Sequence, residues 1–221
     1  MPRLLSTKKL ALHQKELLLN AGFSFVEYDA IHILPKAFNL ENHSVKNAIF
    51  TSKNAVKEVL KKKLPITNCF CVGEKTKNLL EQNQLKVLEM GTSAKELAHL
   101  ILEKYKTEKF IFFCGDKRRD ELPEILNANK VEFEEIQVYK TALNLREFQQ
   151  KFDGILFFSP SGVQSFTAKN NLKGTIAFCI GKTTAAEARK HTSAVEIAGS
   201  PAIENVIART AKYFKTLNIK K

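Results

Sequence analysis

Small polar residues follow apolar, strand-like runs at several places in this chain. The run Ile155 to Phe158 stops abruptly at Ser159-Pro160-Ser161-Gly162. Similar breaks occur at Thr51-Ser52, at Gly73 with Thr76, at Gly115-Asp116, and at Gly181 with Thr183-Thr184. In a sheet of parallel strands these are the positions where loops enter helices, and the free N–H groups of a helix N-terminus attract anions. The chemistry that these residues suggest is the binding of an anionic molecule.

Each of these positions also has a purely structural explanation. Ser and Thr are preferred N-cap residues because their side-chain oxygen accepts a free backbone N–H. Ser93 and Glu96, for example, have the spacing of a capping box. Taken singly, each position is explained as a helix cap. Taken together, in two domains, they would line a cleft with donors for an anion, so both interpretations stay open.

Several familiar sites are absent from the sequence. There is no G-x-G-x-x-G, Gly181-Lys182-Thr183 lacks the earlier glycine of a P-loop, and no nucleophile elbow or triad is evident. The five His are scattered, no C-x-x-C occurs, and the four Cys lie in or beside apolar runs typical of buried positions. We therefore expect no metal and no cofactor.

The net charge of +12 is the unusual bulk property of the 221-residue chain. It favours a polyanionic partner, either nucleic acid or a substrate with several carboxylates or phosphates. Lys makes up 29 of the 35 basic residues, and Lys is poorer than Arg at bidentate recognition. The aromatic residues are mostly Phe inside apolar runs, which argues against nucleic acid. No apolar run approaches ~18 residues and no leader is evident, so we expect a cytoplasmic protein.

An internal repeat of about 108 residues is the most informative feature. Phe50-Thr51-Ser52 matches Phe157-Phe158-Ser159 at an offset of 107, and CVGEKT (71–76) matches CIGKTT (179–184) at an offset of 108. Upstream, Arg3 to Thr7 falls under Ile111 to Gly115 in the same register. The chain therefore consists of two similar halves.

Short apolar runs alternate with amphipathic stretches in both halves. Strands are expected at 3–6, 24–28, 47–51, 69–72, 86–89, 110–114, 132–138, 154–158, 175–180 and 194–197. Helices are expected at 10–21, 53–63, 75–83, 93–105, 119–128, 183–191 and 201–217. This alternation predicts an α/β protein with two similar doubly wound parallel-sheet domains.

Six runs in this order resemble a known family. They are FTSKNAV (50–56), CVGEKT (71–76), FFCGDKRRDELPEIL (112–126), VYKT (138–141), FFSPSGVQSF (157–166) and CIGKTTAAEA (179–188). Together they resemble the uroporphyrinogen-III synthase family. The resemblance implies two α/β domains joined by a two-stranded connector, with connector strands near 32–36 and 137–141.

The resemblance also implies an interleaved chain path. Residues 1–34 plus 142–221 would form one domain and residues 37–138 the other, whereas the repeat alone suggests a tandem split near 108. By this division residues 35–141 hold 19 basic and 15 acidic residues, and the rest of the chain holds 16 and 8. The discontinuous domain would therefore carry most of the excess positive charge.

The activity implied by the resemblance is the closure of hydroxymethylbilane, a linear tetrapyrrole with eight carboxylates, to uroporphyrinogen III. Ring D is inverted, water is lost, and no cofactor takes part. Tyr139 matches the family's connector tyrosine and is either the proton donor or a packed connector residue. The expected substrate-binding residues are Ser52, Gly73, Thr76, Gly115, Ser159, Ser161, Gly181, Thr183 and Lys8.

Two positions depart from the family pattern. Lys53 stands where Pro is frequent, and Lys8 replaces an Arg, which keeps the charge but loses the bidentate fork. We expect a monomer with a small-molecule substrate and neither a nucleic-acid nor a membrane partner. The alternatives are a non-catalytic two-domain protein that binds a tetrapyrrole or another polyanion, and a basic nucleic-acid-binding protein.

Overall fold

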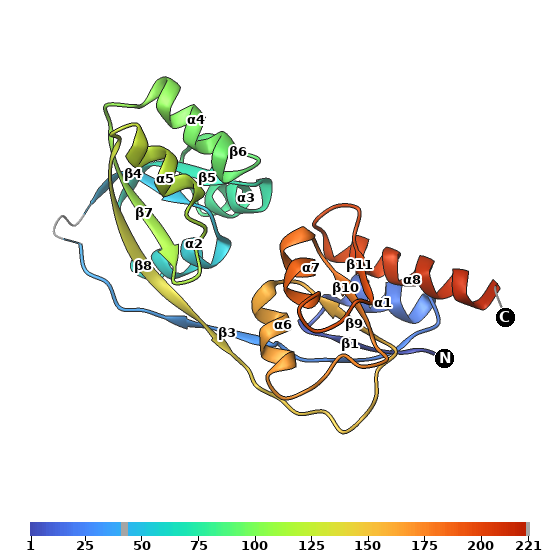
Figure 1. Ribbon diagram of the computed structural model, residues 1–221. Coiled ribbons are helices and arrows are strands. Elements are labelled where there is room, and N and C mark those ends of the chain that lie inside the picture. The colour runs from blue at the N-terminus through green and yellow to red at the C-terminus, as the bar shows by residue number, and fades with distance from the viewer. Residues whose placement is uncertain (41–43, 220–221) are drawn as a thin grey trace. The chain divides into compact units, whose positions relative to one another are not determined.

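A computed structural model describes residues 1–40 and 44–219 of the chain. It divides into two compact units (Figure 1). Unit 1 consists of Met1–His32 and Ala142–Lys221, and unit 2 of Ile33–Thr141. Within the described residues no helix is both long enough and apolar enough to cross a membrane.

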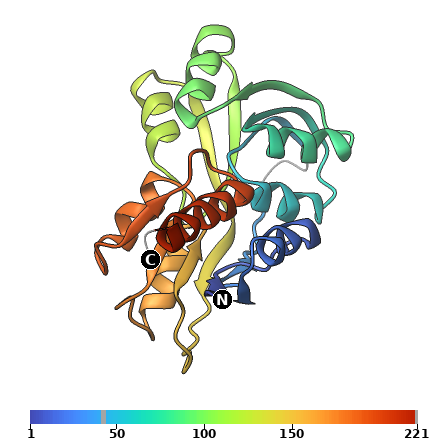
Figure 2. The ribbon, with the colours of Figure 1, turned by 90° about the vertical axis from the view of Figure 1, so that its right-hand side faces the viewer.

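Unit 1 is built on a five-stranded parallel sheet with the strand order β11-β10-β9-β1-β2. Its strands are β1 (Arg3–Ser6), β2 (Ser24–Glu27), β9 (Gly154–Phe157), β10 (Ile176–Cys179) and β11 (Val195–Ile197). Its helices are α1 (Leu12–Asn20), α6 (Pro160–Thr167), α7 (Lys182–Ala188) and α8 (Ile203–Ile219). Helices α1 and α8 contact one another, as do α6 and α7 (Figures 1 and 2).

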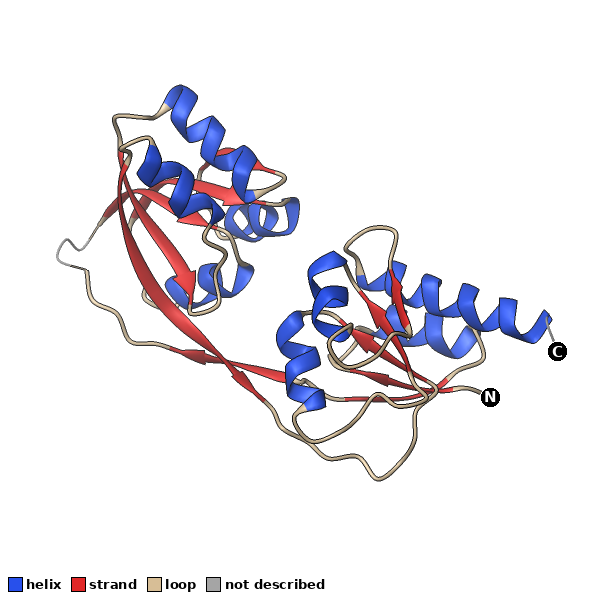
Figure 3. Ribbon diagram, in the orientation of Figure 1, coloured by secondary structure: helices blue, strands red, loops and turns tan. Residues whose placement is uncertain are grey.

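Unit 2 contains a six-stranded sheet with the order β3-β8-β7-β4-β5-β6. Its strands are β3 (Ile31–Pro35), β4 (Val45–Phe50), β5 (Ile66–Val72), β6 (Val87–Gly91), β7 (Lys109–Gly115) and β8 (Glu132–Leu143), of which β3 and β8 extend into unit 1. Its helices are α2 (Lys53–Leu60), α3 (Glu74–Gln82), α4 (Ala94–Lys104) and α5 (Glu121–Ala128) (Figure 3).

Both sheets are apolar on both faces, which is what a doubly wound fold requires. In β4, Ala48 and Phe50 belong to the core cluster beneath α2 and α3, whereas Ile49 belongs to the cluster beneath α4 and α5. The continuous apolar runs of the sequence follow from this two-sided burial. The predicted α/β class with parallel sheets is confirmed.

The internal repeat is visible in the strand orders. Strands β9, β10 and β11 match β4, β5 and β6, and β1 and β2 match β7 and β8, so the two sheets have the same arrangement. Each unit therefore combines strands from both copies of the repeat. The pairing corrects one detail. Ser24 of β2 matches Glu132 of β8 at the offset of 108. Ser24 pairs with Arg3 and Glu132 pairs with Lys109, so Arg3 matches Lys109 and β1 matches β7 at an offset of 106. The register expected for Arg3 to Thr7 is therefore wrong by two residues.

Most expected elements lie within three residues of the observed ones, with two exceptions. The sequence assigned no range to α6, and the ranges 132–138 and 137–141, expected as a strand and a connector strand, form the single strand β8, which runs to Leu143. The expected capping box is also only half formed. Ser93 Oγ accepts the Glu96 N–H, but the Glu96 carboxylate accepts the N–H of Thr92 rather than that of Ser93.

Candidate functional site

The carboxyl ends of the unit 2 strands surround a cavity of about 410 Å³. Strands β4, β5, β6, β7 and β8 and the loops that follow them supply its lining. The lining residues are Thr51, Ser52, Val72, Thr92, Ser93, Ala94, Gly115, Lys117, Arg118, Arg119, Glu121, Leu122 and Tyr139. Hydroxyls and cations thus line the edge at which doubly wound sheets bind ligands.

Ser52 connects the end of β4 to the tyrosine of β8. Its extended backbone makes it the N-cap of α2, and its Oγ accepts the backbone N–H of Asn54 at 3.1 Å. The same oxygen accepts the phenol hydroxyl of Tyr139 at 3.2 Å. The Ser52 side chain therefore both caps α2 and binds the Tyr139 phenol.

Tyr139 reaches this edge through an irregularity in the sheet. Strands β7 and β8 pair Cys114 with Gln137 and then Gly115 with Tyr139, so β8 contains one extra residue at this point. Such bulges re-aim side chains, frequently next to active sites. Tyr139 is half-buried, and burial raises the pKa of its phenol, an effect that the hydrogen bond to Ser52 opposes. The phenol therefore stays protonated at neutral pH.

The loop after β7 is fixed by an ion-pair cluster. The Arg118 guanidinium donates through two nitrogens to the Glu135 carboxylate of β8 and through a third to Asp120. These hydrogen bonds raise the pKa of Arg118. Arg118 is thus bound to the protein itself, and its neighbours Lys117 and Arg119 bring two further cations to the cavity lining.

Gly73 and Thr76 do not lie in this cavity lining. Gly73 is the N-cap of α3 with φ at 81°, a conformation that favours glycine, and its N–H donates to the Gly91 carbonyl. Thr76 is 5% exposed. The structure therefore brings Ser52, Gly115 and Tyr139 together and leaves these two residues in the neighbouring turn.

The other expected residues belong to unit 1. Ser159 is the N-cap of α6 and its Oγ accepts the Gly162 N–H at 3.1 Å, while Ser161 lies in the first turn of that helix. Gly181 is the N-cap of α7, Thr183 is exposed on that helix, and Lys8 is exposed after β1. They occupy the carboxyl ends of β1, β9 and β10, as the sequence indicated for loop-to-helix positions.

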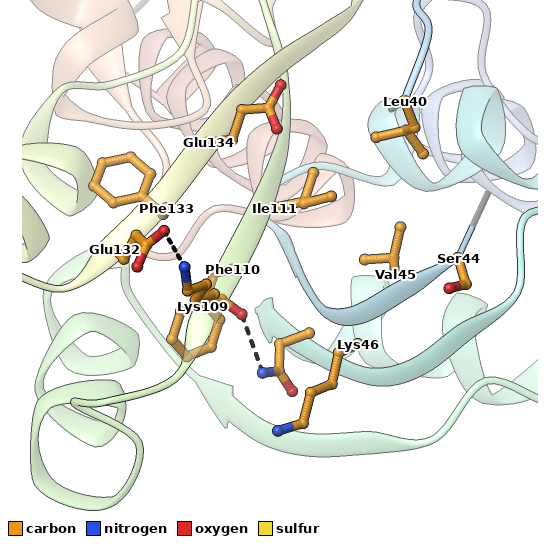
Figure 4. Close-up of a pocket in the computed structure, with 11 residues that line it drawn as sticks. Leu40, Ser44, Val45, Lys46, Lys109, Phe110, Ile111, Glu132, Phe133 and Glu134 are labelled. Carbon is orange, nitrogen blue, oxygen red and sulfur yellow. Dashed lines mark hydrogen bonds and ion pairs between the residues drawn. The ribbon is translucent and has the colours of Figure 1, made fainter. Parts of the chain in front are cut away.

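A second depression, of about 570 Å³, lies at the opposite, amino ends of the unit 2 strands (Figure 4). Several of its polar groups are bound to other protein groups. Lys109 forms an ion pair with Glu132 at 2.7 Å, and the Asn47 amide donates to the Lys109 carbonyl. The edge that carries Tyr139 is therefore the better candidate for chemistry.

Metal chemistry finds no support in the side-chain arrangement. Among residues 1–40 and 44–219, no group of three or more His, Cys, Asp or Glu could hold a metal ion. The four cysteines are buried and free, as their apolar surroundings predicted. Burial raises the pKa of Cys69 to about 12, so this thiol is unreactive.

The fold and the site define a class: a protein of two doubly wound α/β units whose strand ends present hydroxyls and cations suited to an anion. The family model described as "Uroporphyrinogen-III synthase HemD" matches residues 14–208. The chain therefore belongs to the uroporphyrinogen-III synthase family, whose members are cofactor-free lyases of tetrapyrrole biosynthesis. This confirms the resemblance seen in the sequence motifs.

Solved structures agree on the fold. Uroporphyrinogen-III synthetase from Helicobacter pylori superposes with a TM-score of 0.73 at 20% identity, covering 96% of this chain and 100% of that one. A mutant uroporphyrinogen III synthase from Thermus thermophilus gives 0.62 at 15% identity, covering 99% of each chain. At these identities the likeness concerns the fold alone. No curated protein matches the chain.

Two features of the cavity were not predicted from the sequence. The Arg118–Glu135 pair joins residues 17 apart on different elements, and the bulge that aims Tyr139 depends on the pairing of β7 with β8. For the Arg118–Glu135 pair, the available signal was the adjacent pair Arg118-Arg119 within the run FFCGDKRRDELPEIL (112–126), which resembles the family. Nothing in the local sequence signals the second.

Proposed function

We propose that the cavity of unit 2 binds the reacting part of hydroxymethylbilane and that the protein closes this linear tetrapyrrole to uroporphyrinogen III. The single observation that carries the proposal is the Tyr139 phenol held at 3.2 Å from Ser52 in a cavity that Lys117 and Arg119 also line. A substrate with many carboxylates suits these cations and the net charge of +12.

The reaction requires little acid chemistry from the protein. The C–O bond of the hydroxymethyl group breaks as the pyrrole nitrogen supplies electrons, which leaves an electrophilic azafulvene. Ring D then attacks through a spiro intermediate, which inverts the ring before closure. We propose that Tyr139 donates its proton to the departing hydroxyl so that water leaves, and that the protein holds the chain in the inverting geometry.

The remaining contacts are proposed from position. Ser52 would contact substrate oxygens within the cavity through its hydroxyl and Gly115 through its backbone, and Gly73 and Thr76 would do so from the adjacent β5–α3 turn. From unit 1 the proposed contacts with substrate oxygens are Lys8, Ser159, Ser161, Gly181 and Thr183. We further propose that the protein works as a cytoplasmic monomer without a nucleic-acid partner.

The test supplies hydroxymethylbilane and resolves the porphyrin isomers after oxidation. We expect isomer III in excess over the spontaneous isomer I. Formation of isomer I alone, at the uncatalysed rate, would contradict the proposal and favour the non-catalytic binder of a tetrapyrrole or another polyanion. Tight, salt-sensitive binding to duplex DNA without isomer III would favour a nucleic-acid-binding protein.

The role of Tyr139 is tested by Tyr139→Phe. We expect kcat to fall about tenfold, less than the ~10²–10⁴-fold typical of general acid catalysis, because the pyrrole itself expels the leaving group. The matched control is Tyr105→Phe, since Tyr105 lies outside the cavity lining in the same unit and its hydroxyl donates to Glu89. Wild-type turnover by Tyr139→Phe would remove this phenol from the mechanism.

A further inference from the structure

Gly115 lies directly beneath the ring of Tyr139. A Cβ at position 115 would lie 2.3 Å from Tyr139 Cζ, 2.5 Å from Cε2 and 2.7 Å from the phenol oxygen. These distances are far shorter than any normal contact with a Cβ. The place of the phenol is therefore available only because residue 115 has no side chain.

Backbone conformation does not explain the glycine. Gly22, Gly73 and Gly174 have positive φ angles that favour glycine, but Gly115 is not among these residues. Alanine could adopt the backbone of Gly115 without strain. The requirement at this position is space for the ring.

The backbone of Tyr139 is fixed independently of its ring. The Asp116 N–H donates to the Tyr139 carbonyl at 3.2 Å, and the Asp116 carboxylate accepts the Thr141 N–H at 2.8 Å. On the other side, the Lys36 N–H donates to the Val138 carbonyl at 2.9 Å. A side chain at position 115 would thus displace the ring end of Tyr139, which turns about its own torsions, and leave the strand in place.

We propose that Gly115 is a positioning residue for the reaction, which holds the Tyr139 phenol against Ser52 by leaving room for it. The inference deepens the proposed function and rests on it. Gly115 acts through Tyr139, and the extra residue of β8 brings the two residues face to face. Substitution at Gly115 therefore lowers turnover only where Tyr139 has a hydroxyl to misplace.

A double-mutant cycle tests the inference, with kcat and KM measured for wild type, Gly115→Ala, Tyr139→Phe and the double variant. We expect Gly115→Ala to lower kcat about tenfold, as Tyr139→Phe does, with KM changed by less than about twofold. In the Tyr139→Phe background, Gly115→Ala should lower kcat by less than about twofold. A merely structural role would give the same loss in both backgrounds.

The control is Gly199→Ala, because a Cβ at this exposed position meets nothing within 4 Å. It should leave kcat and KM unchanged, and circular dichroism should show Gly115→Ala to be folded. A second measurement titrates the tyrosines by absorbance. The Tyr139 component, obtained by difference from Tyr139→Phe, should move to lower pH in Gly115→Ala as the ring leaves its buried place.

Equal losses in both backgrounds, or wild-type turnover by Gly115→Ala, would overturn the inference while leaving the proposed function standing. An unmoved Tyr139 titration would likewise overturn it. If Tyr139→Phe itself turns over at the wild-type rate, the proposed role of Tyr139 fails and this inference fails with it. If all variants and the wild type yield isomer I alone, the proposed function is the part that fails.

Discussion

In both sheets a serine follows a central strand and caps the next helix, but different groups lie beside these two serines. Ser52 after β4 and Ser159 after β9 are both N-caps with extended backbones. Beside Ser159 lies Thr7: a Cβ built on Gly162 would be 3.4 Å from the hydroxyl oxygen of each residue. The Thr7 hydroxyl donates to the Leu156 carbonyl, so it is bound to the backbone of the protein. Around Ser52 the neighbour is the phenol of Tyr139.

The lengths of two matching strands produce this difference. Strand β2 has four residues and ends at Glu27, whereas its counterpart β8 has twelve, so that Tyr139 still pairs with Gly115 at the end of β7. Unit 1 has a tyrosine directly after β2, but Tyr28 is 4% exposed and packs edge-on against Phe148. The two matching sheets thus differ at this edge because β8 is longer than β2 and contains a bulge, which together bring a tyrosine to Ser52.

The largest expected effect is on the pH dependence of the free energy of unfolding, which should distinguish Tyr28 from Tyr139. Burial raises the pKa of Tyr28 from 10.0 to about 12, so its stabilisation is complete below pH 10 and is lost as pH rises toward 12. The loss amounts to about 2–3 kcal/mol at most. Urea unfolding at several alkaline pH values should show that Tyr28→Phe removes this part of the pH dependence. An equal loss of pH dependence in Tyr139→Phe would contradict the distinction between the buried Tyr28 and the half-buried Tyr139.

The next effect is on turnover, which should distinguish Ser52 from Ser159. Ser52→Ala and Ser159→Ala should each lower the free energy of unfolding by about 1 kcal/mol through loss of the cap. Ser52→Ala should also lower kcat about fivefold, because the Tyr139 phenol loses a hydrogen bond worth about 1 kcal/mol. Ser159→Ala should act on KM instead. Chemical denaturation and steady-state kinetics check both, and equal kcat losses would contradict the contrast.

The smallest effect concerns the exposed cation of unit 1. Lys8→Ala should raise KM about two- to fivefold with kcat unchanged, the size expected of an exposed charge. The increase should shrink at high salt because exposed charges are screened. Lys8→Arg, which keeps the charge, is the matched control and should restore KM. A salt-independent change, or one in kcat, would show that Lys8 does not act on a carboxylate by charge.

The features that the sequence predicted are those that depend on residues close together in the chain. Apolar runs located the strands, and the serines after them located the caps of α2 and α6, because both signals are local. The partner of Ser52 lies 87 residues away, and its approach depends on a one-residue bulge between β7 and β8. Register is set by pairing of whole strands, so no local pattern reports it. The motif resemblance identified Tyr139, but the closeness of its ring to Gly115 follows from the packing of β8 beside β7, which no local pattern reports.

The interleaving of the two repeat copies has a consequence for synthesis of the chain. Unit 2 is contiguous, so it can fold as soon as residues 33–141 have left the ribosome. Strand β1 leaves first, yet its partner β9 begins only at Gly154. At ~5–20 residues per second, Leu4 and Leu5, fully buried in the finished protein, wait about 10–30 s for that partner. During this interval the apolar side chains of β1 and its unpaired strand edge stay exposed, which makes this segment an aggregation hazard for the nascent chain.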